Sequence, residues 1–146
     1  MPSRRFQYAV SLTRDGGRLA TIRAGERPPI ATAPPEDFGE GDPRRWSPEH
    51  LFLAAVQSCT MLSFLSQAEH HDLEVLGYEC EIEGTITRRA EDGRYAFVQV
   101  RQVPRVTVAG GKGAAARSLT GKAERDCFVS ASTTAETIVD WDIQEV

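Results

Sequence analysis

Residues 47–71 read SPEHLFLAAVQSCTMLSFLSQAEHH, and this stretch predicts one long helix that is apolar on nearly all sides. Ser47 is a favourable N-cap, while Pro48 at the first helical position and Glu49 in the first turn mark the start of the helix. Its apolar side chains point in too many directions for a surface helix with a single apolar stripe. Such a helix runs about 36 Å, which is more than a domain of this size encloses alone. We therefore expect a core helix that a second subunit helps to cover.

The composition is that of a single globular domain over residues 1–146, with 40% hydrophobic and 26% charged residues. A formal net charge of −4 offers no attraction to phosphate backbones or anionic membrane surfaces, so neither nucleic acid nor a membrane is expected as a partner. Residues 1–30 contain no apolar run long enough for a signal sequence, and we expect a cytoplasmic protein. Three cysteines are too few for a disulfide framework, so any disulfide would be chemical rather than architectural.

Before the long helix, the sequence predicts a hairpin followed by a long loop. Apolar and polar residues alternate loosely through residues 6–22, with turn residues at 14–17. Residues 24–46 carry clusters of proline and glycine and read as a partly extended loop. Because loops of this length in compact domains tend to be functional, we expect this one to shape or cover a pocket.

After the long helix, the sequence predicts a second hairpin, a helix and a last strand. Residues 75–86 and 95–108 form a longer antiparallel pair, in which Pro104 indicates an edge position or a bulge. Residues 114–128 predict a helix, and residues 138–146 a terminal strand. The order ββ-α-ββ-α-β defines an α+β fold, with antiparallel sheets packed around the central helix.

The three thiols differ in their surroundings. Cys80 is in phase with the apolar residues Tyr78 and Ile82 of its strand, which predicts an inert core thiol. Cys59 and Cys127 lie in predicted helical segments among small polar residues. Spacing alone leaves two interpretations open for this pair, small core residues or reactive groups, because it matches no general cysteine motif.

Two motifs resemble those of a known family. The segment Ser47-Pro48-Glu49-His50-Leu51-Phe52-Leu53-Ala54-Ala55, followed by Ser58-Cys59, is similar to the first cysteine segment of the OsmC/Ohr family of osmotically inducible and organic hydroperoxide resistance proteins. The segment Cys127-Phe128-Val129-Ser130-Ala131-Ser132 resembles the second cysteine segment of that family. The two motifs agree with the family in their order and separation. The predicted hairpins, helices and strand fit the family along almost the whole chain.

The resemblance implies a fold, an assembly and a reaction. It implies the OsmC-like fold and an intertwined homodimer with two active sites at its interface. The implied activity is a thiol-dependent peroxidase that reduces organic hydroperoxides without a cofactor. Cys59 would be the peroxidatic thiol and Cys127 the resolving thiol, and a dithiol or lipoyl-type reductant would then reduce the disulfide between them.

The resemblance also implies an arginine that holds the peroxidatic thiolate and a glutamate that orients this arginine. Arg18 is the best match by its distance from the Pro-Glu motif, with Arg14 and Arg23 as alternatives, although each could equally be a solvated hairpin charge. Glu49 is the matching glutamate, and it also suits the helix dipole. Ten residues of helix separate Glu49 from Cys59, about 15 Å, so either Glu49 serves the other subunit or the helix is broken.

Two departures from the family pattern bear on the pocket. Phe128 follows the second cysteine where many members have proline, and Trp46 precedes Ser47 where small residues are usual. These bulky side chains favour large hydrophobic hydroperoxides or mark a branch with altered activity. The alternative function is therefore a noncatalytic protein that senses oxidation or binds an apolar ligand. The three histidines, at 50, 70 and 71, have no spacing that completes a metal site.

Overall fold

The computed structural model describes residues 3–146, and the chain divides into two compact units. The first unit ends at Phe52, and the second comprises Leu53–Val146. Helix α1 (Pro48–His70) is the predicted long helix and begins in the first unit. Its N-cap is confirmed, because the hydroxyl of Ser47 accepts a hydrogen bond of 3.1 Å from the backbone N–H of His50.

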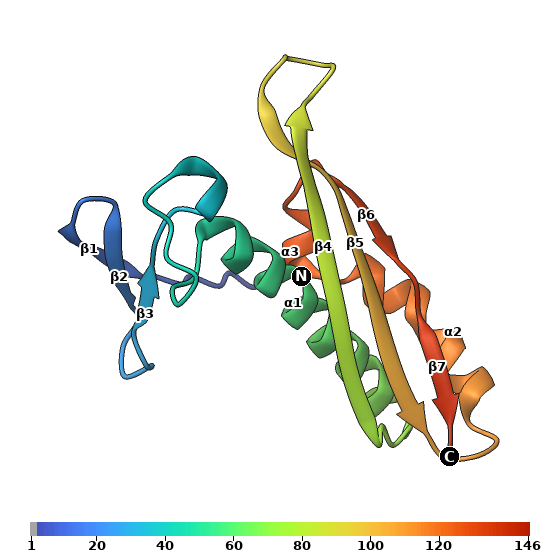
Figure 1. Cartoon of the computed structure of the whole chain (residues 1–146). Coiled ribbons are helices and arrows are strands. Elements are labelled where there is room, and N and C mark those ends of the chain that lie inside the picture. Colours follow the sequence, from blue (N-terminus) through green and yellow to red (C-terminus); the bar gives the residue numbers. More distant parts are fainter. Residues whose placement is uncertain (1–2) are drawn as a thin grey trace. The chain divides into compact units, whose positions relative to one another are not determined.

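The first unit contains a three-stranded antiparallel sheet in the order β1-β2-β3 (Figure 1). Strands β1 (Ser11–Gly16) and β2 (Leu19–Arg23) form the predicted hairpin, which is shorter than expected because residues 6–10 lie outside the strand. The turn lies at Gly17 and Arg18, where the left-handed φ of 55° at Gly17 suits a residue without a side chain.

The predicted loop 24–46 contains a strand that the sequence did not indicate. Strand β3 (Ile30–Thr32) pairs with β2, and the short 3₁₀ helix η1 (Glu36–Phe38) follows it. Three residues between prolines carry no periodic signal of their own, so only the neighbouring strand reveals β3. The sheet is extended further by a parallel bridge between Thr32 and Trp46.

The second unit contains a four-stranded sheet centred on β5, and its strand directions correct the sequence prediction. Strand β4 (Gly77–Arg88) pairs with β5 (Tyr95–Val108) in the predicted antiparallel hairpin. The single predicted terminal strand is two short strands, β6 (Glu136–Val139) and β7 (Asp142–Glu145), and both run parallel to β5. The chain between β5 and β6 is a helical crossover, which is the kind of connection that parallel pairing requires.

Pro104 lies in the central strand, so the predicted edge position or bulge is wrong. The carbonyls of Gln102 and Val108, which share the parity of Pro104, accept hydrogen bonds from Asp140 and Val146 on the β6–β7 side. The missing N–H of Pro104 therefore faces the junction between β6 and β7, where the ladder is interrupted. The bulge of this hairpin lies instead at Val98 of β5, opposite Thr85 and Ile86 of β4.

The core of the second unit lies between one face of the sheet and helices α1 and α2 (Gly113–Arg125). The even-numbered residues of β5 from Val100 to Val108 are buried on this face. Phe64 of α1 is fully buried, and its ring centroid lies 5.1 Å from that of Trp141. The buried core cluster consists of Phe64, Ala68, Leu73, Val106, Val108, Ala116, Leu119 and Ala123.

Helix α1 buries a single row of side chains, although nearly all of its circumference is apolar. The buried row contains every fourth residue, Val56, Thr60, Phe64 and Ala68. Leu62, outside this row, is 59% exposed. By length and composition alone α1 is also apolar enough to cross a membrane, but its packing within the core cluster is that of a core helix in a globular unit.

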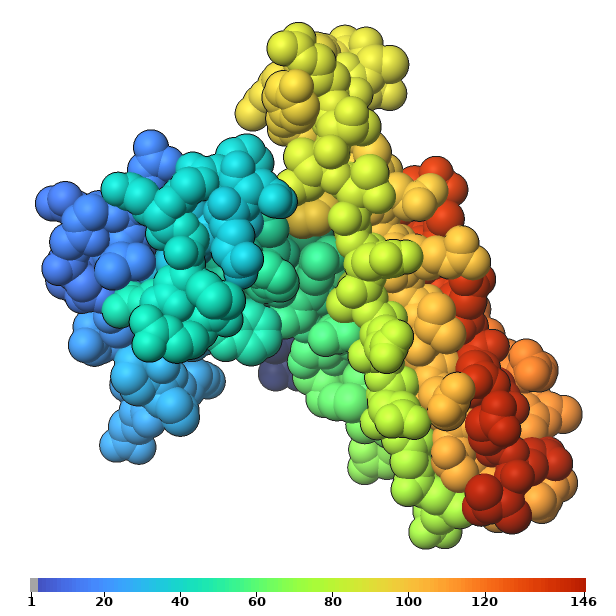
Figure 2. Space-filling view, in the orientation of Figure 1, coloured from blue at the N-terminus to red at the C-terminus, as the bar shows by residue number. Residues whose placement is uncertain are grey.

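The other face of the second unit's sheet is polar. Figure 2 shows β4 and β5 side by side along this face. The odd-numbered residues from Glu79 to Glu83 and from Arg101 to Arg105 are exposed. Arg105 lies 3.7 Å from Glu79 and 3.1 Å from Asp142 in exposed ion pairs. This alternation between an inner face against the helices and a charged outer face is typical of a sheet that is covered on one side only.

Candidate functional site

The two predicted thiols of the site lie in the second unit and contact each other. Cys59 is half-buried on α1, one residue before Thr60 of the buried row. The sequence placed Cys127 at the end of the helix predicted over residues 114–128, but α2 ends at Arg125. Cys127 is instead the N-cap of the short helix α3 (Phe128–Ala131) and is only 1% exposed. Cys59 and Cys127 are close enough for each to influence the pKa of the other, and neither forms a disulfide in this structure.

A cavity of about 630 Å³ opens beside the thiol pair. Leu62, Phe128 and Ala131 give it apolar walls, and Arg125 contributes a charge. Phe128, one of the two departures from the family pattern, is 72% exposed here. The cavity is therefore large enough for an apolar molecule of moderate size whose reactive end meets the two sulfur atoms.

Burial is the largest influence on Cys59 and raises the pKa of its thiol. The backbone N–H groups of Val129 and Phe128, at the start of α3, donate hydrogen bonds to the sulfur and oppose this rise. The neighbouring Cys127 raises the pKa of Cys59 further. The main influences on the pKa of Cys59 do not include a guanidinium or ammonium group, although Arg125 lines the same cavity.

Cys127 behaves in the opposite way. Burial acts to raise the pKa of the Cys127 thiol, but hydrogen bonds from Ser130, Thr60 and Cys59 outweigh it and hold the pKa below its ordinary value. The hydroxyl of Ser130 donates to the sulfur at 3.2 Å, and the hydroxyl of Thr60 lies 3.6 Å from it. The Cys127 sulfur thus has hydroxyl partners of its own, which favour its charged form.

The sequence analysis did not predict a row of buried, hydrogen-bonded polar side chains next to Cys127. Gln102 of β5 is fully buried and donates a hydrogen bond of 3.0 Å from Nε2 to the hydroxyl of Thr60. Its Oε1 accepts a hydrogen bond of 3.6 Å from the thiol of Cys80. A glutamine in phase with the buried Val100 and Pro104 was the signal that could have revealed it, because buried polar side chains need partners.

Cys80, which the sequence predicted as an inert core thiol, is half-buried rather than buried. Burial still raises the pKa of its thiol. Its sulfur donates toward Gln102 and toward the carbonyl of Glu81 at 3.5 Å. No disulfide partner lies beside it in the described part of the chain, where all three cysteines are free.

Arg18 and Glu49 belong to the first unit. Arg18 is 64% exposed in the turn of the β1–β2 hairpin, and its Nε lies 3.4 Å from the carboxylate of Glu40. Arg14, the alternative, donates a hydrogen bond of 2.8 Å to the carbonyl of Gly17 in the same turn. Arg23, the other alternative, ends β2. The Oε1 atom of Glu49 is buried and has no hydrogen-bond partner among the described residues.

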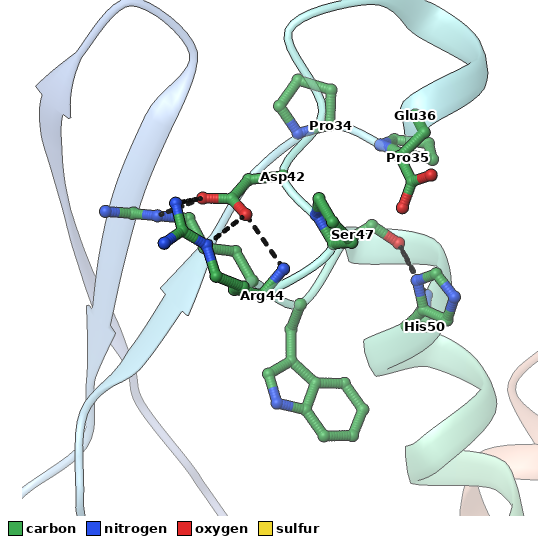
Figure 3. Close-up of a pocket in the computed structure, with 10 residues that line it drawn as sticks. Pro34, Pro35, Glu36, Asp42, Arg44, Ser47 and His50 are labelled. Atoms are coloured by element: carbon green, nitrogen blue, oxygen red, sulfur yellow. Dashed lines mark hydrogen bonds and ion pairs between the residues drawn. The ribbon is translucent and has the colours of Figure 1, made fainter.

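The loop 24–46 lines a hollow of about 280 Å³ at the start of α1, as predicted (Figure 3). Asp42 and Arg44 face each other there, and this ion pair lowers the pKa of Asp42. On the helix side, the hydroxyl of Ser47 lies 2.6 Å from Nδ1 of His50. Trp46, the second departure from the family pattern, also lines this hollow.

No group of three or more metal-binding side chains comes together within residues 3–146.

Comparisons with known proteins identify the family. A sequence profile described as OsmC-like protein matches residues 39–142. An OsmC-like protein of unknown function from Vibrio cholerae has a TM-score of 0.86 at 19% identity, covering 94% of this chain and 99% of that one. An organic hydroperoxide resistance protein from Elizabethkingia anophelis has a TM-score of 0.70 at 17% identity, covering 98% and 100%.

The organic hydroperoxide resistance protein OhrB of Bacillus subtilis has a TM-score of 0.64 at 20% identity, covering 95% of this chain and 98% of that one. No curated protein sequence matches the chain. These similarities agree with the α+β architecture described above, and the profile spans most of the sequence. The chain therefore belongs to the OsmC/Ohr family, which includes organic hydroperoxide resistance proteins.

Proposed function

We propose that this protein is a thiol-dependent peroxidase that reduces organic hydroperoxides to alcohols. The observation that carries the proposal is that Cys59 and Cys127 lie next to each other at the wall of one largely apolar cavity. The cavity accepts the organic part of the hydroperoxide, while the half-buried Cys59 is the more accessible sulfur. Membership of a family that includes organic hydroperoxide resistance proteins supports the same reaction.

The reaction has two steps. The Cys59 thiolate attacks the outer oxygen of ROOH, the O–O bond breaks, and the alkoxide takes a proton to leave as ROH, so that Cys59 becomes a sulfenic acid. The Cys127 sulfur then attacks the sulfenic sulfur, the S–O bond breaks, and hydroxide takes a proton to leave as water. The Cys59–Cys127 disulfide that results is reduced by a dithiol or lipoyl-type reductant, which restores both thiols.

The first step needs a cation near Cys59, because burial raises the pKa of this thiol. We assign this role to Arg18, whose exposed ion pair with Glu40 is of a kind that contributes little stability and is easily exchanged. Arg14 is less suitable, since its guanidinium is held in the hairpin turn. Glu49 would orient Arg18, and its buried Oε1 atom needs a hydrogen-bond donor.

We propose that a second copy of the chain completes the site. Helix α1 is continuous from Pro48 to His70, which favours a Glu49 that serves the other subunit over a broken helix. The N-terminal segment also exposes a row of large apolar side chains at alternate positions, which an intertwined homodimer would cover. This row consists of Phe6, Tyr8, Val10 and Leu12.

A noncatalytic alternative remains, in which the cavity binds an apolar ligand or the thiol pair reports oxidation. The raised pKa of Cys59 favours this alternative as long as no cation reaches the thiol. Consumption of an organic hydroperoxide with dithiothreitol or dihydrolipoamide separates the two functions, because only an enzyme turns over. We expect turnover, and we place the enzyme in the cytoplasm, where such reductants keep thiols reduced.

One equivalent of an organic hydroperoxide should convert the protein to a form with a Cys59–Cys127 disulfide. The reason is that the two thiols already contact each other, whereas Cys80 contacts neither. Peptide mapping after alkylation of the unfolded protein should find Cys80 alkylated and the other two cysteines linked. A bridge that contains Cys80 would contradict the assignment of the site.

Cys59→Ser should reduce peroxide consumption to background, because a hydroxyl stays protonated near neutral pH and is a poor nucleophile. Cys127→Ser should still consume one equivalent per site, since attack on the peroxide needs only Cys59. Its sulfenic acid would then persist or overoxidise, which mass spectrometry detects. Full activity in Cys59→Ser would instead support the noncatalytic alternative for this thiol pair.

Arg18→Ala should raise the pKa of Cys59 and slow its oxidation by the hydroperoxide, without preventing formation of the disulfide. The rate of Cys59 oxidation measured against pH checks this expectation. Arg14→Ala and Arg23→Ala are matched controls from the same hairpin and should change the rate little. A defect in one of these controls alone would move the role to that arginine and leave the two cysteines in place.

The protein should be a homodimer in light scattering at micromolar concentration, with a buried area of about 2,000 Å² or more, as in obligate dimers. Leu12→Asp should weaken the dimer, because Leu12 is 64% exposed and belongs to the apolar row. Thr13→Asp is the matched control, since adjacent residues of a strand point to opposite faces. A wild-type protein that stays monomeric would rule out a site shared between subunits.

A further inference from the structure

Gln102 is a polar side chain in the interior of the second unit, and each end of its amide has a partner. The amide nitrogen donates to the hydroxyl of Thr60 at 3.0 Å, and the amide oxygen accepts from the thiol of Cys80 at 3.6 Å. Gln102 is fully buried and Thr60 is 1% exposed, so solvent does not compete for these bonds. The Cys80 contact fixes which end of the amide faces Thr60.

The hydroxyl of Thr60 can switch between two acceptors. Gln102 occupies one of its lone pairs, and its single hydrogen can point to the carbonyl of Val56 at 3.0 Å or to the sulfur of Cys127 at 3.6 Å. When Cys127 carries a proton, its S–H donates to Thr60, and Thr60 donates to Val56. When Cys127 is a thiolate, the hydroxyl can turn and donate to the sulfur instead.

Few groups around Cys127 can stabilise a negative charge on its sulfur, and the hydroxyl of Thr60 is one of them. Cys59 lies beside it on α1, Cys127 contributes to the raised pKa of Tyr78 on β4, and Arg125 and Asp126 line the same cavity at the end of α2. Arg125 is 81% exposed and pairs with Asp126 at 3.4 Å. The contacts of the Cys127 sulfur are thus made by neutral donors, and the donors other than Cys59 are Thr60 and Ser130.

We propose that Thr60 stabilises the Cys127 thiolate for its attack on the Cys59 sulfenic acid, and that Gln102 is the residue that positions Thr60. The inference rests on the proposed peroxidase function. In the assisted step, the Cys127 sulfur supplies the electron pair of the new S–S bond, and the S–O bond of the sulfenic acid breaks. The departing hydroxide takes up a proton and leaves as water.

The first measurement is the pKa of Cys127, which does not depend on peroxidase activity. Cys59→Ser isolates the Cys127 titration, followed by the ultraviolet absorbance of the thiolate after subtraction of Cys59→Ser/Cys127→Ser. Adding Thr60→Val, which keeps the shape of the side chain but loses the hydroxyl, should raise the pKa by about one unit, the scale of one charge-assisted hydrogen bond. Thr60→Ser should restore the value, and Gln102→Met should shift it in the same direction as Thr60→Val.

The second measurement is the rate of disulfide formation from the sulfenic acid, in proteins that retain both cysteines. A one-unit rise in pKa lowers the thiolate fraction about tenfold at low pH, but it also increases the nucleophilicity of the thiolate about threefold. Thr60→Val should therefore close the disulfide about threefold more slowly below both pKa values and about threefold faster above them. A merely structural defect would slow the reaction at every pH and would show no crossover.

Thr120→Val is the matched control, because Thr120 of α2 also donates to a carbonyl of its own helix, at 2.9 Å, away from the thiols. This variant should match the wild type in both measurements. An unchanged Cys127 pKa in Thr60→Val, or a rate that falls equally at all pH values, would overturn the inference. If the pKa shifts but no sulfenic acid forms on Cys59, the catalytic role is overturned, and the proposed function, not the hydrogen-bond network, is the part that failed.

Discussion

One row of side chains on α1 packs against the inner face of β5, and the arrangement of the thiol site in the second unit depends on this packing. Val56, Thr60, Phe64 and Ala68 recur at every fourth position and are the only residues of the helix that are buried within the described chain. Since each residue turns the helix by about 100°, Cys59 lies at the edge of this row, while Thr60 lies inside it. The same contact therefore exposes one reactive group to the cavity and directs its neighbour into the core.

In this arrangement, the surroundings of the two thiols shift their pKa values in opposite directions. Burial keeps the proton on Cys59, and the neutral donors around Cys127 favour its charged form. In the proposed reaction, the resolving thiol would then have donors of its own, whereas the peroxidatic thiol would need a cation. The protein would then react only where a guanidinium reaches Cys59, which would couple the first chemical step to the assembly of the complete site.

The half-covered helix and the polar outer face of the sheet have different consequences. Charged residues on the outer face of β4 and β5 are solvated and paired, so that face is stable in water as it stands. The exposed apolar side chains of α1 and of residues 6–12 are not compensated in this way. In the proposed homodimer, a second copy would bury these side chains.

The sequence by itself determined the elements whose signals are local. The long helix and its cap at Ser47, the two hairpins and the α+β class follow from periodicity, capping residues and turns, and the two cysteine motifs identified the family. Strand β3, the parallel strands β6 and β7 and the position of Pro104 did not follow, because strand pairing depends on segments that are remote in the sequence.

The same limit applies to the site. The sequence indicated Cys59 and Cys127 as a pair, but their contact requires the start of α3 to approach the middle of α1. Thr60, which contacts the Cys127 sulfur, is hydrogen-bonded to Gln102, and these two residues are 42 positions apart and carry no motif. Only the tertiary structure decided these features, because hydrogen bonds in a core are set by which faces pack together, and an apolar helix without a single stripe leaves that choice open.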